Sequence, residues 1–315
     1  MISRPETRVS NTSRALFGLE INFDKEEGDP SRVFVAMSEL IKACQDIDRK
    51  LVNAIQIDIE PILLLEDIQK GSLIAWIKST FRVSKDTPSL GFDSNRLEEY
   101  LDQSKFTLVD FMRDKTTLTD GGLAEVQMKI FDILSEKKPT PELPIYTPIP
   151  KKDLLSGIQK IQSAVAYLGE NNDSAKYISR DNIKTPFNLT LEITPGSIED
   201  LLTKETITNE MTMLLKVKKP DYLGSSQWEF KEGKVTIDAK VNDFEWLEKF
   251  RSRDLVLAPG DSLLAIVEIV SKYDIDGNLI STRHTLLKVL DVRTIPLSNE
   301  PKQGRLDFLE EGFQN

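Results

Sequence analysis

Cysteine and histidine are almost absent from this sequence: its 315 residues contain one of each, Cys44 and His284. A single cysteine excludes an internal disulfide and a cysteine-rich zinc site. A single histidine excludes the HExxH zinc motif and iron sites that need several histidines. The sequence also lacks the GxxxxGK[ST] phosphate loop and the GxSxG turn of serine hydrolases. Any catalysis would therefore depend on carboxylates, lysine, serine or tyrosine.

Long apolar runs and a positive net charge are missing too. The most apolar run, residues 59–77, is interrupted by charged residues, so we expect no membrane insertion. The polar start of the chain predicts no secretion signal, and we expect a cytoplasmic protein. The net charge is −10, which argues against nucleic acid as a partner, because binding to a phosphate backbone depends on positive charge.

The first part of the chain predicts a strand, a long helix, a hairpin and two further helices. Residues 15–23 alternate as a strand does, and Asp29-Pro30 is typical of a helix start. In the helix after this start, apolar residues recur at spacings of three and four: Met37, Leu40, Cys44, Ile47, Leu51 and Ala54. This stripe indicates either a face buried against a sheet or a helix–helix seam in a homo-oligomer. A β-hairpin around Lys70-Gly71 and helices at 94–114 and 120–135 complete the predicted domain.

A proline-rich segment divides the sequence, and the second half of the chain is rich in strands. We predict an α+β domain at 1–136, a linker at 137–152, a mainly antiparallel β barrel or sandwich at 153–298 with a leading helix, and an acidic tail at 299–315. The expected strands are 187–193, 210–218, 227–231, 234–241, 263–274, 279–290 and 291–295. A short helix is expected at 243–252, and Asp276-Gly277 is typical of a hairpin turn.

Three residues of the second half match the letters of a metal-dependent nuclease: Asp221, Glu229 and Lys231. In such an enzyme the two carboxylates would hold Mg²⁺ and the lysine would stabilise charge on the phosphate. Asp221, however, lies in a predicted loop only eight residues before Glu229, and few helices surround it. We therefore favour a charged hairpin, and we expect no cofactor unless the nuclease hypothesis, with Mg²⁺, is right.

Two other groups of residues predict binding. Lys216, Lys218, Lys219, Arg251 and Arg253 would form a basic cluster suited to a phosphate ligand or nucleotide or to an acidic partner, or the lysines would protect edge strands. In the tail, Gln303, Leu306 and Phe308 have the spacing of peptides that bind the bacterial sliding clamp. The apolar hairpin around Trp76 is a further candidate partner surface.

The sequence resembles uncharacterised prokaryotic families from mobile elements and anti-phage defence neighbourhoods. The resemblance rests on the strand ALFGLEINF, the helix start at Asp29-Pro30, and the run from Trp228 through Asp243 to Pro259-Gly260-Asp261. It implies a bacterial protein with a role in antiviral defence and assigns no catalytic residue. Our leading hypothesis is a non-enzymatic binding adaptor or sensor, homo-oligomeric, with another protein of the same system as its partner.

Overall fold

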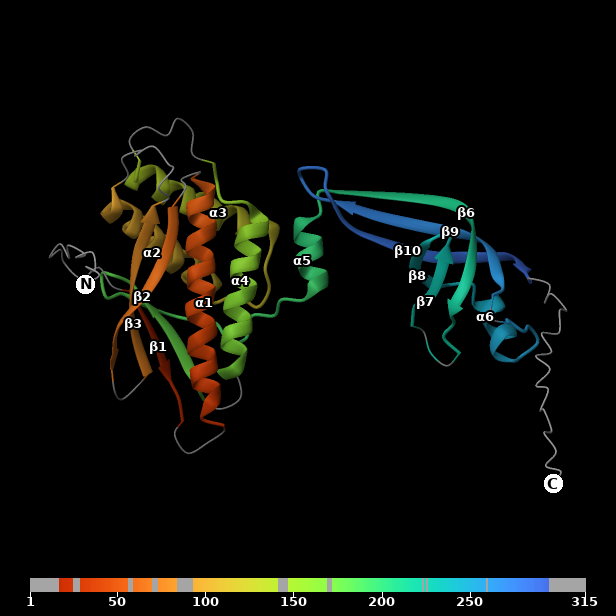
Figure 1. The fold of residues 1–315 in the computed structure, drawn as a ribbon, viewed down its shortest axis with the longest axis horizontal. Coiled ribbons are helices and arrows are strands. Elements are labelled where there is room, and N and C mark those ends of the chain that lie inside the picture. The colour runs from red at the N-terminus through yellow and green to blue at the C-terminus, as the bar shows by residue number, and fades with distance from the viewer. Residues whose placement is uncertain are drawn as a thin grey trace, which may run out of the picture. The chain divides into compact units, whose positions relative to one another are not determined.

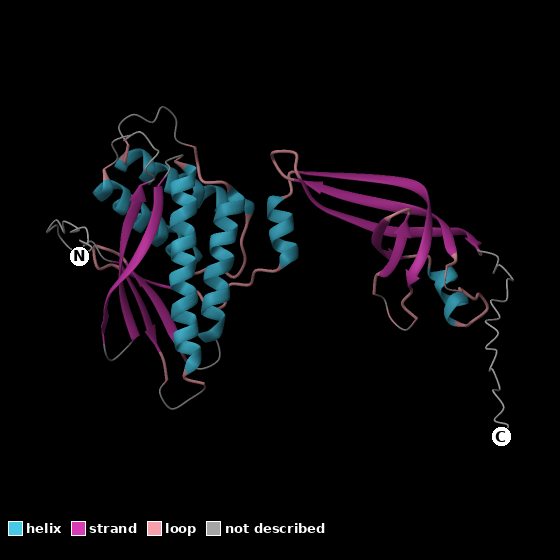
Figure 2. Ribbon diagram, viewed as in Figure 1, coloured by secondary structure: helices cyan, strands magenta, loops and turns pink. Residues whose placement is uncertain are grey.

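The chain folds as two units, Met1–Leu202 and Thr203–Asn315. The structure is a computed structural model that describes residues 17–24, 29–55, 59–69, 73–83, 93–140, 147–168, 172–222, 224, 226–258 and 260–294. Helices and a sheet build the N-terminal unit, and strands dominate the C-terminal one (Figure 2). In the described part of the chain, no helix has the length and apolar character needed to cross a membrane. The predicted α+β class is confirmed.

The N-terminal unit contains a five-stranded antiparallel sheet in the order β2-β3-β1-β4-β5. Its strands are β1 (Phe17–Asn22), β2 (Ile59–Gln69), β3 (Leu73–Val83), β4 (Ser174–Ile178) and β5 (Lys184–Pro186). The helices are α1 (Ser31–Ala54), α2 (Ser94–Met112), α3 (Asp120–Lys137), α4 (Lys151–Val165) and α5 (Pro195–Leu202), with a 3₁₀ turn η1 at Ala166–Leu168. The predicted first strand, long helix, hairpin and two further helices are therefore present.

The helices pack against one face of this sheet. Successive side chains of a strand point to opposite faces, and the apolar set of β1 lies on the face that the helices cover. Phe17, Leu19 and Ile21 of β1 point toward the helices and are buried in the core. The apolar stripe of α1 joins the same core, which confirms the prediction of a face buried against a sheet. The expected homo-oligomer stays a prediction. Gly18 and Glu20, which alternate with the buried residues of β1, lie on the opposite face.

Helix α4 belongs to the N-terminal unit, contrary to the boundary expected at the proline-rich segment 137–152. It runs beside α1 (Figure 1), and a Cβ on Gly157 would lie only 2.9 Å from Cγ1 of Ile47. Such close contact places both helices in one core. Ile149, in the described part of the proline-rich segment, is buried in the same core, and the division between the units falls after Leu202. Strands β4 and β5 also lie on the N-terminal side of that division.

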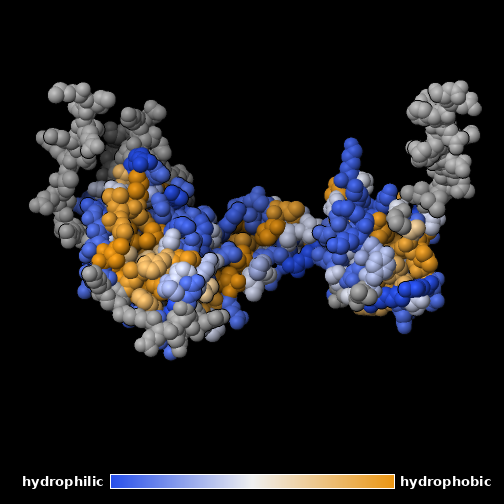
Figure 3. Space-filling model, turned by 60° about the horizontal axis from the view of Figure 1, so that its bottom comes forward, coloured by the Kyte–Doolittle hydropathy of each residue, from blue (hydrophilic) through white to orange (hydrophobic). Residues whose placement is uncertain are grey.

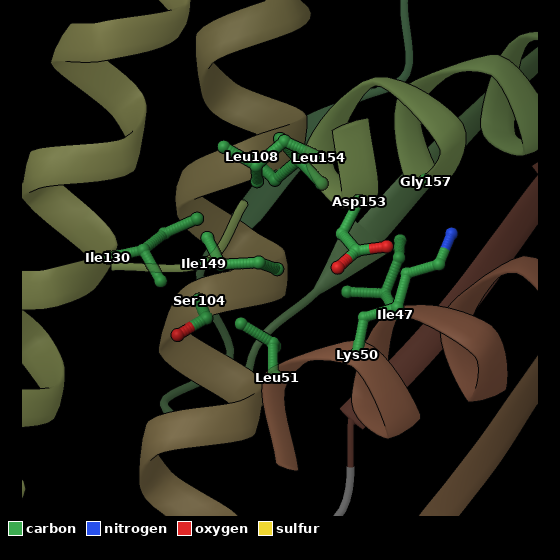
Figure 4. A pocket seen from close by; sticks show the side chains of 10 residues that line it. All are labelled: Ile47, Lys50, Leu51, Ser104, Leu108, Ile130, Ile149, Asp153, Leu154 and Gly157. Carbon is green, nitrogen blue, oxygen red and sulfur yellow. The ribbon is translucent and has the colours of Figure 1, made fainter. Parts of the chain in front are cut away.

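A small cavity of about 10 Å³ lies among the helices of this core. Figure 4 shows the residues that line it: Ile47, Lys50, Leu51, Ser104, Leu108, Ile130, Ile149, Asp153, Leu154 and Gly157. The hydroxyl of Ser104 is buried and has no hydrogen-bond partner among the described residues. A cavity of this size admits about one water molecule. It is therefore a detail of packing and not a ligand site.

The C-terminal unit is a closed five-stranded barrel in the order β10-β8-β7-β6-β9. Its elements are β6 (Glu205–Lys219), β7 (Trp228–Glu232), β8 (Val235–Val241), α6 (Phe244–Arg251), β9 (Ser262–Tyr273) and β10 (Leu279–Arg293). Strand β6 pairs with β7 and β9, and β8 runs parallel to β10. In the chain, α6 follows β8 and precedes β9. This is the topology of an OB-fold barrel.

Most of the strands predicted in the second half are present, with two differences. The segment 291–295 is not a separate strand, because β10 continues to Arg293, and 187–193 is not a strand. The amide of Asn188 donates to the carbonyls of Met112 and Lys115, at 2.9 and 2.6 Å, so this segment is tied to the end of α2. The turn at Asp276-Gly277 is confirmed, with Gly277 at a φ of 77°.

Aromatic rings fill one end of the barrel. Trp228 of β7 is 2% exposed and contacts the rings of Phe230, Trp246 and Phe250 at centroid distances of 5.0 to 6.0 Å. Asp243 caps α6 by accepting from the backbone N–H of Trp246 and also accepts from that of Val289. The short helix is thereby held against the barrel core.

Candidate functional site

A cleft of about 520 Å³ lies on the N-terminal unit. Seven of the described residues line it: Glu66, Asp67, Gln69, Trp76, Ser179, Arg180 and Asn182. They come from the end of β2, the middle of β3 and the turn between β4 and β5. Its volume is in the range of sites that hold small molecules or a partner's side chain.

The ring of Trp76 lies close to Gly18 on the neighbouring strand β1, where there is no side chain to displace it. Gly18 pairs with Trp76 on one side and with Ile178 on the other. A Cβ at Gly18 would lie 3.1 Å from Cζ3 of Trp76 and 3.1 Å from Cδ1 of Ile178. The indole N–H of Trp76 is buried and has no hydrogen-bond partner among the residues that the structure describes. A donor without a partner is costly, and a ligand acceptor would remove that cost.

One wall of the cleft carries hydrogen-bond acceptors. The pairing of β2 with β3 shifts between Leu65 and Asp67, so Glu66 is the extra residue of a β-bulge. The bulge shifts the register of β2 by one residue, so that Asp67 pairs with Trp76. Glu66, Asp67 and Gln69 are all exposed. Two carboxylates and an indole ring therefore line the same cleft, and both kinds of group attract cations.

The other wall is a tight turn that carries donors. The N–H of Ser179 donates to the carbonyl of Ile183, at 2.9 Å, and the N–H of Asn182 donates to the carbonyl of Ser179, at 2.9 Å. Asn182 has a φ of 61°, a left-handed conformation that asparagine tolerates better than most residues. Arg180 and Asn182 of this turn line the cleft, and the Arg180 guanidinium donates to the carbonyl of Asn95, at 3.4 Å, so this wall carries donors.

A buried carboxylate holds this turn in place from behind. Asp102 of α2 accepts from the backbone N–H of Arg180, at 3.0 Å, and from the hydroxyl of Tyr177, at 2.7 Å. It is 4% exposed, and burial raises its pKa against the effect of these two hydrogen bonds. Asp102 therefore positions the donor wall.

Next to Asp102 lies a buried ion pair between Lys105 of α2 and Asp48 of α1, with side chains 1% and 0% exposed. The Lys105 ammonium also lies 4.8 Å from the centroid of the Phe17 ring. Burial raises the pKa of Asp48 to about 6, against the attraction of Lys105. This pair joins two helices to the sheet beneath the cleft.

This network was not predicted from the sequence, although the sequence carries a signal for it. Lys105 follows Leu101 by four residues and precedes Leu108 by three, so it occupies a position in the apolar stripe of α2. Asp48 follows Cys44 by four residues in α1. A charged residue at a buried helical position indicates a buried partner of opposite charge.

We expect Gly18→Ala to lower the free energy of unfolding by about 1–3 kcal/mol, because the new methyl group must displace Trp76 or Ile178. Urea denaturation followed by tryptophan emission measures this loss. Gly121→Ala is the matched control, since a Cβ there meets nothing within 4 Å. Equal stability of the two variants would mean that the contact between Trp76 and Gly18 is loose.

The two carboxylates of the nuclease motif each have a local partner, and the lysine lies opposite another lysine. Asp221 accepts from the backbone N–H groups of Gly224 and Ser226, at 2.9 and 2.8 Å, and so organises its own loop. Glu229 forms an ion pair with Lys218, and Lys231 lies opposite Lys216 on β6. Within the described ranges, no group of three or more His, Cys, Asp or Glu side chains is gathered as a metal site requires. These contacts are those of a charged hairpin.

The predicted basic cluster is only partly brought together. Lys216, Lys218 and Lys219 are exposed on β6, and Lys218 is paired with Glu229. Arg251 at the end of α6 donates to the carbonyl of Gly224, so it lies against the loop after these lysines. Arg253 lies two residues beyond the end of α6, where it is exposed and has a φ of 67°.

Of the predicted partner-binding residues, Trp76 lies in the cleft. Gln303, Leu306 and Phe308 lie outside the described residues. The single histidine, His284, lies within β10 opposite Ala239 of β8, and burial lowers its pKa. The single cysteine, Cys44, is buried, and burial raises its thiol pKa to about 12.

Comparisons with protein-family models, with curated proteins and with solved structures found no match to this chain.

Proposed function

We propose that this chain is a non-enzymatic binding protein, and that its N-terminal unit recognises a protein partner by taking an arginine side chain of that partner into the cleft at Trp76. The observation that carries the proposal is the buried indole N–H of Trp76, which has no partner among the described residues and lies in a cleft with two exposed carboxylates. Glu66 and Asp67 suit a guanidinium, which also stacks on indole rings. The indole N–H and Asn182 suit a main-chain carbonyl of the same partner.

An exposed apolar side chain on the face of the cleft supports a protein partner. Leu64 of the edge strand β2 is 45% exposed, whereas Leu65 and Ile68 pair with the buried Ile77 and Ala75 and so belong to the other face. Leu64 pairs with Lys78, two residues from Trp76 along β3, and so shares the face on which Trp76 lies. Hydrophobic residues gather on the visible surface of each unit (Figure 3). Interfaces between proteins combine apolar contact area with direct hydrogen bonds.

A binding role, as opposed to catalysis, agrees with the state of the chain's reactive groups. The thiol of Cys44 stays protonated at neutral pH because its pKa is about 12, and only the thiolate is a good nucleophile. The resemblance to defence-associated families supports an adaptor or sensor in a bacterial antiviral system. The partner would then be another protein of that system.

Titration with arginine amide, followed by NMR of the tryptophan indole N–H groups, tests the cleft directly. The chain has three tryptophans, and the signal lost in Trp76→Phe is that of Trp76. We expect only this signal to shift, because Trp228 and Trp246 lie in the barrel. The double variant Glu66→Lys with Asp67→Lys should abolish the shift. Lysine substitution at Glu125 and Asp132, on α3 and away from the cleft lining, should leave it unchanged.

Capture of proteins from phage-infected bacterial cells then tests the partner. We expect one protein to be retained by the wild type and by the α3 control variant, and to be lost with Trp76→Ala and with the cleft double variant. A protein retained equally by all four chains, or an arginine amide titration without a shift of Trp76, would refute the proposal.

A further inference from the structure

The outer face of the barrel sets two lysines directly opposite each other, next to a pair of carboxylates, Glu229 and Asp238, that are opposite each other on β7 and β8. Lys216 of β6 and Lys231 of β7 are directly opposite each other in the sheet, and both are exposed. Like charges at directly opposed positions repel each other. Thr236 of β8 follows Lys231 in the same row, and Lys240 adds a further exposed cation on β8. An anionic ligand would relieve this repulsion.

The net charge of the chain does not oppose such a ligand here, because the acidic charge lies elsewhere. Residues 203–294, which include the whole barrel, contain fourteen Lys and Arg against fifteen Asp and Glu, a net charge of −1. Most of the overall −10 therefore belongs to the N-terminal unit. Lysines on the barrel face thus act in an almost neutral unit.

Beside these lysines, the loop between β6 and β7 presents an aromatic ring. Tyr222 is 60% exposed, and its ring stacks on Phe250 with centroids 5.3 Å apart. Phe250 is itself 6% exposed and stacks on Trp246, so the platform is anchored in the barrel core. The carboxylate of Asp221 and the guanidinium of Arg251 hold the same loop. An anchored and largely exposed ring is a stacking platform for a base.

We infer that the C-terminal barrel binds single-stranded nucleic acid, with a base stacked on Tyr222 and phosphates bound by Lys216 and Lys231. Cations along a sheet and an exposed aromatic ring are the two elements that sequence-independent binding of single strands requires. Lys231 lies on the second strand and Tyr222 in the loop between the first and second strands, both on the binding side of an OB-fold barrel, and Lys216 lies opposite Lys231 on the first strand. This site is independent of the proposed partner cleft, which lies on the other unit.

Fluorescence anisotropy of the full chain with labelled oligothymidine at several salt concentrations tests the inference. We expect Tyr222→Ala to weaken binding about tenfold through loss of stacking, and Tyr222→Trp to retain it. Lys216→Glu with Lys231→Glu should weaken binding further and reduce the salt dependence, log K against log salt, by about 0.7 for each lysine. Lys288→Glu is the matched control, since Lys288 is exposed on β10 and pairs with β9.

Three results would overturn the inference: no saturable binding by the wild type at low salt, equal binding by the wild type and Tyr222→Ala, or equal losses in Lys288→Glu and in the variant of the opposed lysines. Competition with duplex DNA of the same length tests whether the binding is specific for single strands. If the duplex competes as well as oligothymidine does, the face binds phosphate without single-strand recognition, and the role of Tyr222 is refuted.

Discussion

Lys105→Met is expected to lower the free energy of unfolding of the N-terminal unit by about 3–5 kcal/mol, because it leaves the buried carboxylate of Asp48 without its counter-charge. The same change removes a cation from the face of the Phe17 ring and from beside Asp102. The variant should therefore also loosen the turn at Arg180, which Asp102 holds. Equilibrium denaturation in urea, with tryptophan emission and circular dichroism as signals, measures the loss.

The control for this prediction is the double variant Asp48→Leu with Lys105→Met. Replacing both members of a buried ion pair with apolar residues of similar size is often neutral or stabilising. We expect the double variant to recover most of the stability that Lys105→Met loses. If it is no more stable than Lys105→Met, the charge of Lys105 serves mainly Asp102, and the pair with Asp48 is secondary.

Trp228→Ala is expected to destabilise the barrel by about 3–5 kcal/mol and to leave the N-terminal unit folded. The ring is 2% exposed and contacts three other aromatic rings, so its removal leaves a large cavity in a small core. Limited proteolysis with mass spectrometry measures the effect: cleavage within 203–294 should become fast, while fragments of the N-terminal unit persist.

Phe244→Ala is the matched control, since Phe244 is an aromatic residue near Trp228 in the chain but 74% exposed. A change at such a surface position costs about 0.5 kcal/mol or less, so we expect the wild-type cleavage pattern. Rapid cleavage of both units in Trp228→Ala would mean that the two units do not fold independently. Unchanged cleavage would mean that the aromatic cluster tolerates the cavity.

Trp228→Ala also separates the two proposed activities. It should abolish binding of oligothymidine, because Tyr222 rests on Phe250 and Phe250 contacts Trp228. It should leave the response of Trp76 to arginine amide intact, because Trp76 lies in the other unit. A sensor that binds nucleic acid with one unit and a protein partner with the other would show this division.

The residue pattern by itself determined the local elements of this protein. The alternation of β3 and the 3,4 spacing in α1 and α2 each report which side of one segment is buried, and burial there has the same period as the element. Strand β1 is buried on both faces, which its alternation did not indicate. The hairpin turn at Gly277 was also predictable from the sequence, because a turn position with a positive φ favours glycine. The expectation of a barrel or sandwich came from the number of short strands.

Only the tertiary structure decided which segments meet. The cleft joins Trp76 to a turn at Ser179–Asn182, and Asp102 reaches that turn from a helix, over sequence separations that no periodic pattern reports. The sequence did not predict that α4 belongs to the N-terminal core. A proline-rich segment indicates where a helix begins, but it does not indicate what the helix packs against. The local charge of a binding surface was also not predictable from the net charge of −10, which describes the whole chain. A ligand contacts only the side chains that one face of the fold brings together.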